Sequence, residues 1–233
     1  MTAHVQAAEV ALGARLSLGG LSTRRPWVAA GLGLVAVELV SLLEYSREPA
    51  YAADRALLGV TLGVVVPLVC YALFEAVYGK DRTASLLDPL GRHGADRRRL
   101  SLGANAALSL GCAATSAVLT AVAAVSAHGF GDPAVLVADS FASLWGGALS
   151  GAAYAALFAV ASPFGRRGRI AALVLDWLFG SGAGLFAVIW PRGHARNLFG
   201  GEPVLDWSQA VAALVLGVFA IAGIGFAAVR ETR

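Results

Sequence analysis

The chain has 233 residues, of which 58% are hydrophobic and only 14% are charged, and its mean hydropathy is +0.69. A soluble domain carries roughly a quarter charged residues, so the composition excludes an ordinary soluble protein and indicates a chain surrounded mainly by membrane lipid. The pI of about 9.2 does not indicate a nucleic-acid partner, because the basic residues stand at the ends of apolar runs instead of forming one basic face.

The beginning of the chain predicts a helix that lies on the membrane surface. Over residues 3–18, Val5, Ala8, Leu12 and Leu16 recur at helical spacing, with polar residues elsewhere. The first 25 residues hold both acidic and basic side chains and no continuous apolar core, so we expect no cleavable signal peptide.

Six apolar runs follow that are long enough to cross a bilayer, for which about 20 apolar residues are needed. Polar loops separate each pair, so we expect one all-α domain over residues 1–233, a polytopic bundle of six transmembrane helices. The expected spans are residues 27–43, 56–77, 100–127, 134–161, 170–190 and 208–229.

The distribution of lysine and arginine predicts that both ends of the chain are cytoplasmic, because cytoplasmic loops of membrane proteins carry the excess of these residues. With the N-terminus inside, fourteen basic residues are on the inner side and four are on the outer side. The outer four are Arg47, Arg55, Arg192 and Arg196, and the inner set extends from Arg15 to Arg233.

Glu38 is an ionisable residue inside the first span. It follows Pro26 by twelve residues, or about 18 Å of helix, which predicts a position in the outer half of the bilayer. Such a group is a functional-site hypothesis, here for a polar pathway or for pairing with a basic residue. The alternative is a protonated or snorkelling carboxylate close to the outer interface, and the sequence leaves both open.

Other polar features of the spans favour structural roles. We expect Asp139, near the outer end of the fourth span, and Asp176, near the inner end of the fifth, to reach water or an interfacial arginine such as Arg169. Residues 180–184 favour a packing face of small residues, because all four histidines lie outside the spans and no serine–histidine pair can form. The outer loop at 191–206 predicts either a short re-entrant element or an ordinary connection.

The chain contains no sequence typical of catalysis. Neither a GxxxxGK[ST] phosphate-binding loop nor an HExxH metal motif occurs, so we expect no enzyme, no cofactor and no metal site in this chain. Cys70 and Cys112 both lie in apolar runs and predict buried, unreactive thiols.

The loop over residues 78–99 is the longest strongly charged segment between spans, and it ends in three consecutive arginines. Inside it, Thr83–Leu87 predicts a short helix that Asp88-Pro89 closes. Leu86, Leu87 and Leu90 form an apolar patch, which favours docking in a groove of a soluble partner. The alternative is a solvated loop whose arginines only fix the topology.

At this loop the chain resembles the permease subunits of ABC-2-type ABC transporters. The residues that carry the resemblance stand in the family's order: an acidic residue, a Leu-Leu-x-Pro core, an arginine cluster and a glycine at the head of the third span. They are Glu75, Leu86, Leu87, Pro89, Arg97–Arg99 with Leu100, and Gly103. Two departures are the longer segment 91–96 and Ala104, where a lysine is common.

The resemblance implies an exporter that performs no catalysis itself. Two permease subunits, identical or different, would face each other in the cell (inner) membrane, and two cytoplasmic ABC ATPase subunits would bind ATP and Mg²⁺. Residues 165–169 would be a minor contact, and the substrate stays open. The coupling residues that the resemblance implies are Thr83, Ser85, Leu86, Leu87, Asp88, Pro89, Leu90, Arg97, Arg98 and Arg99. The competing interpretation is a membrane anchor or scaffold that docks a soluble partner through residues 78–99 without transport.

Overall fold

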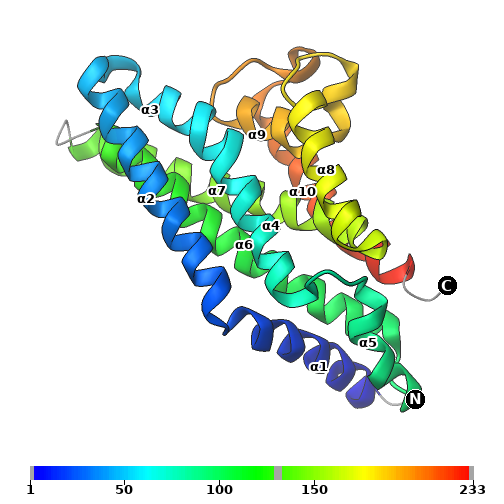
Figure 1. Cartoon of the computed structure of the whole chain (residues 1–233). Helices are drawn as coiled ribbons and strands as arrows, with labels where there is room; N and C mark the ends of the chain where they lie inside the picture. Colours follow the sequence, from blue (N-terminus) through cyan, green and yellow to red (C-terminus); the bar gives the residue numbers. More distant parts are fainter. Residues whose placement is uncertain (1–2, 129–132, 231–233) are drawn as a thin grey trace.

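The computed structural model describes residues 3–128 and 133–230, and every regular element in these two ranges is helical (Figure 1). Arg233, which the sequence places on the inner side, lies outside the described residues. The first half of the chain contains α1 (Ala3–Leu21), α2 (Arg24–Arg47), η1 (Pro49–Tyr51), α3 (Ala52–Arg55), η2 (Ala56–Val65), α4 (Val66–Tyr78), α5 (Thr83–Arg92) and α6 (Arg97–His128).

The second half begins with one long helix and ends with another, and shorter elements lie between them. Its elements are α7 (Pro133–Ala161), η3 (Ser162–Phe164), α8 (Gly165–Phe179), η4 (Leu185–Ile189), α9 (Pro191–Leu198), η5 (Val204–Asp206) and α10 (Gln209–Arg230).

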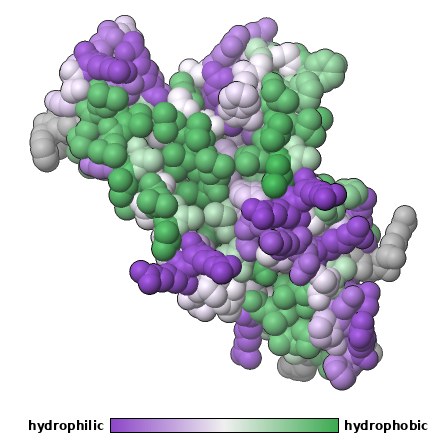
Figure 2. Space-filling view, in the orientation of Figure 1, coloured by the Kyte–Doolittle hydropathy of each residue, from purple (hydrophilic) through white to green (hydrophobic). Residues whose placement is uncertain are grey.

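Five helical segments among the described residues are long and apolar enough to cross a membrane, which identifies a multi-pass membrane protein. They are Arg24–Arg47, Pro49–Arg92, Arg97–His128, Leu136–Phe179 and Gln209–Arg230. Figure 2 shows a broad hydrophobic surface in the upper half of the view, between hydrophilic residues at the top and further hydrophilic groups at mid-height, and a smaller hydrophobic area below them. Exposed apolar side chains such as Leu32 and Ile221, 67% and 79% exposed, are suited to contact with lipid.

The expected fifth span over residues 170–190 is not one continuous helix. Helix α8 begins earlier, at Gly165, and ends at Phe179, and the short η4 follows a turn. Gly180, Gly182 and Gly184 stand in this turn, and glycine is a poor helix former because it loses the most backbone freedom on folding. The chain therefore leaves the helix well before Pro191.

Helix α1 extends the predicted helix by one turn and packs along the first half of α6. At their crossing the two backbones touch: a Cβ atom added to Gly103 would lie 1.9 Å from the Val10 carbonyl oxygen, and one added to Gly13 would lie 2.0 Å from that of Leu100. Only glycine fits at such a contact. Gly103 at the head of the third span therefore has a packing reason in this fold.

Helices α6 and α7 pack in the same way, through small residues. Gly151 faces the carbonyl of Cys112, and Gly147 faces the side chain of Thr120, both too close for a Cβ atom. Small residues let helix backbones approach within a membrane, where the hydrophobic effect does not drive association. Beside this contact, Phe158 packs its ring on Phe74 at 5.8 Å, and both cysteines are free and buried, as predicted.

The described ends of the chain lie at the same end of the molecule as α5 (Figure 1). Glu9 of α1 pairs with Arg99 at the head of α6, 2.8 Å apart. Arg230 at the end of α10 lies over the ring of Phe164, 4.7 Å from its centre. We call this the α5 end, and we call the opposite end, where α3 and α9 lie, the α9 end.

Candidate functional site

Helix α5 is a separate helix between two membrane-crossing segments, and a glycine turn creates it. Helix α4 ends at Tyr78, and Gly79 has φ +60°, a backbone conformation that residues with a side chain rarely adopt. Four residues later α5 begins at Thr83, where the Ser85 hydroxyl donates a hydrogen bond of 2.6 Å to the Arg82 carbonyl. The predicted helix in the loop is confirmed, but the prediction that Asp88-Pro89 closes it was wrong, because α5 continues through Pro89 to Arg92.

The apolar side of α5 faces the protein instead of the solvent. Thr83 and Leu87, one turn apart, are 1% and 0% exposed, and Leu86 and Leu90 are half-buried. Ser85, Pro89 and Arg92 are exposed. The leucine patch that the sequence predicts as a docking surface therefore fixes α5 to the bundle through Leu87, and a partner would meet the exposed residues of α5 with parts of Leu86 and Leu90.

The three arginines at the start of α6 have three different surroundings. Arg97 pairs with Asp88 of α5 at 3.0 Å, and Arg99 pairs with Glu9 of α1 at 2.8 Å. Arg98 is exposed. The Arg99 guanidinium and the backbone N–H of Asp96 both bind the Glu9 carboxylate, and the hydrogen bond from Arg99 lowers the pKa of Glu9. The cluster thus joins α1, α5 and α6.

Behind α5, a buried arginine joins α8 to the end of α4. Arg169 is fully buried, and its Nη2 lies 2.7 Å from Glu75 Oε1 and also donates to the Gly79 carbonyl. Its Nη1 donates to the Asp81 carbonyl at 3.4 Å. Arg166 lies 3.4 Å from the other oxygen of Glu75. Glu75, predicted from the resemblance only as an acidic residue before the loop, is therefore the link between α4 and α8.

A groove of about 670 Å³ separates the N-terminal part of α5 from the start of α8. Four basic and two acidic side chains line it, so its charge is positive. The basic residues are Lys80, Arg82, Arg166 and Arg167. The structure therefore brings residues 165–169, the second inner loop of the sequence, beside the predicted coupling helix.

Glu38 is not part of the α5 end. Its half-buried carboxylate accepts a hydrogen bond from the Ser126 hydroxyl, close to the C-terminal end of α6. Among the described residues, no basic residue contacts Glu38. The arginines nearest to it in the sequence, Arg47 and Arg55, form ion pairs with Glu44 instead. Glu38 is thus a polar link between α2 and α6, and a pathway role stays a prediction.

Asp176 has a partner that the sequence does not suggest. It is fully buried, and it pairs with Arg192, not with Arg169: the backbone N–H of Arg192 donates to it at 3.1 Å, and Arg192 Nε lies 3.4 Å away. The Tyr154 hydroxyl donates a third hydrogen bond at 3.1 Å. Because α8 begins early, Asp176 lies near its C-terminal end and faces the segment that the sequence places outside.

The same arginine also explains a proline in the second span. Arg192 Nη2 donates to the carbonyl of Gly63. Pro67, four residues after Gly63, has no N–H with which to occupy that carbonyl. A proline within an apolar run is therefore the one sequence signal that could have indicated a donor from elsewhere in the chain.

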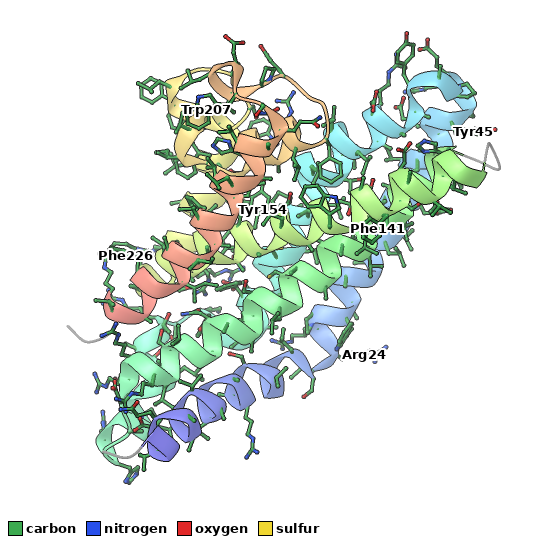
Figure 3. The ribbon with its side chains drawn as sticks, turned by 180° about the vertical axis from the view of Figure 1, so that it is seen from behind. Arg24, Tyr45, Phe141, Tyr154, Trp207 and Phe226 are labelled. Carbon is green, nitrogen blue, oxygen red and sulfur yellow. The ribbon has the colours of Figure 1, made fainter. Side chains whose placement is uncertain are left out.

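The segment 191–206 is not an extended connecting loop, because it forms the short elements α9 and η5, which pack into the molecule. Helix α9 is mostly buried, and the His194 ring stacks on Trp207 with centres 5.8 Å apart. Asn197 donates to the Trp207 carbonyl at 2.8 Å. Burial lowers the pKa of His194 because it disfavours the charged ring. Figure 3 shows Trp207 in this folded segment, beyond Tyr154 of α7.

Within residues 3–128 and 133–230, no three His, Cys, Asp or Glu side chains are placed to share a metal ion. Comparison with protein-family models, with curated proteins and with solved structures finds no match for this chain.

Proposed function

We propose that this chain is the permease subunit of an ATP-driven ABC transporter of the ABC-2 type, an exporter in the cell (inner) membrane. The observation that carries the proposal is the position of α5, a ten-residue helix that follows α4 after a turn and packs against α6 and against η3, the segment before α8. Buried Leu87 packs α5 against the bundle, and Asp88 pairs with Arg97 of α6. The turn before α5 is joined to α8, because Arg169 donates hydrogen bonds to the carbonyls of Gly79 and Asp81.

These links make α5 suitable for transmitting force. A push on a surface helix moves only what is joined to it, and α5 is joined to α4 by a short turn and to α6 by a four-residue segment. Arg169 and Glu75 connect the same turn to α8. An ATPase that closes on ATP would therefore shift α4, α6 and α8 together, and the ATP and Mg²⁺ would bind to that partner.

The proposal includes six crossings with both chain ends in the cytoplasm. Helix α8 with the turn and η4 after it would form the fifth crossing, and α10 would form the sixth. The basic groove beside α5 would then face the cytoplasm, consistent with the excess of basic residues in inner loops. A second permease subunit would complete the pathway.

Crosslinking from α5 tests the proposal. The two native cysteines are buried, so one cysteine introduced at exposed Ser85 gives a single reactive thiol. We expect Ser85→Cys, treated in native membranes with a maleimide crosslinker, to form a product that contains a soluble ATPase with a phosphate-binding loop. Ser46→Cys, exposed at the α9 end, is the matched control and should capture no ATPase.

The same two variants test the orientation. An impermeant maleimide should label Ser46→Cys in intact cells and Ser85→Cys only after the cells are opened. A Ser85→Cys product with a protein that lacks a nucleotide-binding loop would identify a membrane scaffold instead. Equal capture of the ATPase from both positions, or capture from neither, would overturn the proposal.

A further inference from the structure

The α9 end contains a cleft of about 680 Å³, a size typical of sites for small organic molecules. Its walls come from α3 and η2 on one side and from the ends of α9 and α10 on the other, with α6 and α7 as the floor (Figure 3). Leu57, Trp145 and Phe199 give it an apolar and aromatic lining. Neither the coupling links nor the buried pair of Asp176 uses this cleft.

The charged groups in the cleft are Asp54, Asp139 and His128. His128 and Asp139 form a pair at 2.8 Å between the imidazole Nε2 and the carboxylate. The other ring nitrogen, Nδ1, lies 2.9 Å from the Ala124 carbonyl. Since both neighbours are acceptors, only the doubly protonated ring donates to both. Asp139 therefore has a hydrogen-bond partner of its own within the cleft, which Asp54 does not share.

Asp54 has no hydrogen bond or ion pair within the described part of the chain. The four arginines at this end are engaged elsewhere: Arg47 and Arg55 with Glu44 and Glu48, Arg192 with Asp176, and Arg196 with the Ser181 carbonyl. The cleft therefore carries a net negative charge whether His128 is protonated or neutral. An exposed carboxylate without a partner, in a cleft that Trp145 and Phe199 also line, is suited to a positively charged ligand, because ring faces attract cations.

We propose that this cleft binds a lipophilic organic cation, with Asp54 as the charge partner and Trp145 and Phe199 against the ligand's apolar body. Under the proposed function, on which this inference rests for its biological meaning, the cleft would be a substrate site of the exporter. The binding itself requires no ATPase, so it can be measured separately.

The test uses two probes of the same size and shape and opposite charge. We expect radiolabelled tetraphenylphosphonium to bind the full chain in nanodiscs saturably, as measured by equilibrium dialysis against empty nanodiscs. Tetraphenylborate should bind no more than it does to empty nanodiscs. Asp54→Asn should weaken tetraphenylphosphonium binding about tenfold, since removing a charge partner typically costs at least that much.

Two further variants separate the charge from the fold. Asp54→Glu should retain binding within a few-fold, and Glu202→Gln, an exposed carboxylate at the same end that does not line the cleft, should leave it unchanged. Equal binding of both probes, unchanged binding by Asp54→Asn, or no saturable binding above empty nanodiscs would overturn the inference. Failure of the Ser85→Cys crosslink with intact tetraphenylphosphonium binding would instead reject the transporter assignment alone.

Discussion

At the α5 end, charged side chains from different helices form ion pairs, and most of them are exposed to water. At the α9 end, the central ion pair, Asp176 with Arg192, is buried. Asp88 and Arg97 have side chains 37% and 42% exposed, while Asp176 and Arg192 are 0% and 6% exposed. Exposed pairs contribute little to stability, but removing one partner of a buried pair leaves an uncompensated charge. The first arrangement can exchange partners, and the second fixes the fold.

The difference matches the two roles proposed for the ends. Glu75 already contacts two arginines, Arg166 and Arg169, so the link between α4 and α8 has an alternative donor at hand. At the other end, the hydrogen bonds of Asp176 hold α7, α8 and α9 in one arrangement. We infer that the ion pairs at the α5 end rearrange more easily than the buried pair of Asp176 and Arg192 at the α9 end.

The largest effect that tests this difference between the two ends is expected from removing the buried carboxylate of Asp176. We expect Asp176→Asn to lower the free energy of unfolding by about 3–5 kcal/mol, because Arg192 would stay buried without its counter-charge. Thermal unfolding in mild detergent measures the loss. Glu202→Gln, an exposed carboxylate at the same end, is the control and should change stability by less than about 0.5 kcal/mol. If Asp176→Asn unfolded at the same temperature as the wild type, the pair of Asp176 and Arg192 would not stabilise the fold.

The next largest effect is expected at the contact of α1 with α6, which holds the two helices together at the α5 end. Gly103→Ala places a methyl group 1.9 Å from the Val10 carbonyl oxygen, so we expect a loss of about 1–3 kcal/mol although alanine favours helices. Gly217→Ala in α10 is the matched control, since the nearest atom is 4.0 Å away, and it should be neutral or stabilising. If both variants melted alike, α1 would not be packed as described.

A third experiment compares the two ends directly. Glu75 and Glu44 have side chains of similar exposure, 19% and 16%. Glu75 faces a fully buried arginine, so Glu75→Gln should cost about 2 kcal/mol. Glu44 faces exposed arginines at 3.4 Å and 3.8 Å, so Glu44→Gln should cost less than about 1 kcal/mol. Unfolding measured side by side gives the ranking, and a reversed order would contradict the assignment of Arg169 as the link.

Much of this fold follows from patterns within short stretches of sequence. Hydropathy predicts the apolar helices, and the Tyr78-Gly79 turn with the polar run after it predicts the separate helix α5, because these signals depend on near neighbours. The face that α5 presents could not be predicted. From the sequence alone, Leu87 could be either exposed or buried, because its burial depends on how α4 and α6 are placed around it.

The pairings of the charged residues were the least predictable part. Asp176 stands seven residues from Arg169 and sixteen from Arg192 along the chain, and only the early end of α8 at the Gly180 turn brings the more distant arginine to it. The cleft could not be predicted from the sequence for the same reason, because its walls come from segments that are distant in the sequence. Asp54 and Trp145 carry no local pattern that links them.

The smallest expected effect concerns the pair of Glu9 and Arg99, which joins α1 to the head of α6 at the α5 end. Because Arg99 lowers the pKa of Glu9, the pair contributes its full stabilisation above the ordinary glutamate pKa of about 4.3 and loses it as the pH falls through the lowered pKa. Wild type should therefore melt slightly above Glu9→Gln at pH 7, and the two should converge under strong acid. Glu202→Gln should show no such convergence. A difference that persisted or grew in acid would mean that Glu9 acts through packing and not through its charge, and the α5 end would then be less dependent on exchangeable ion pairs than its geometry indicates.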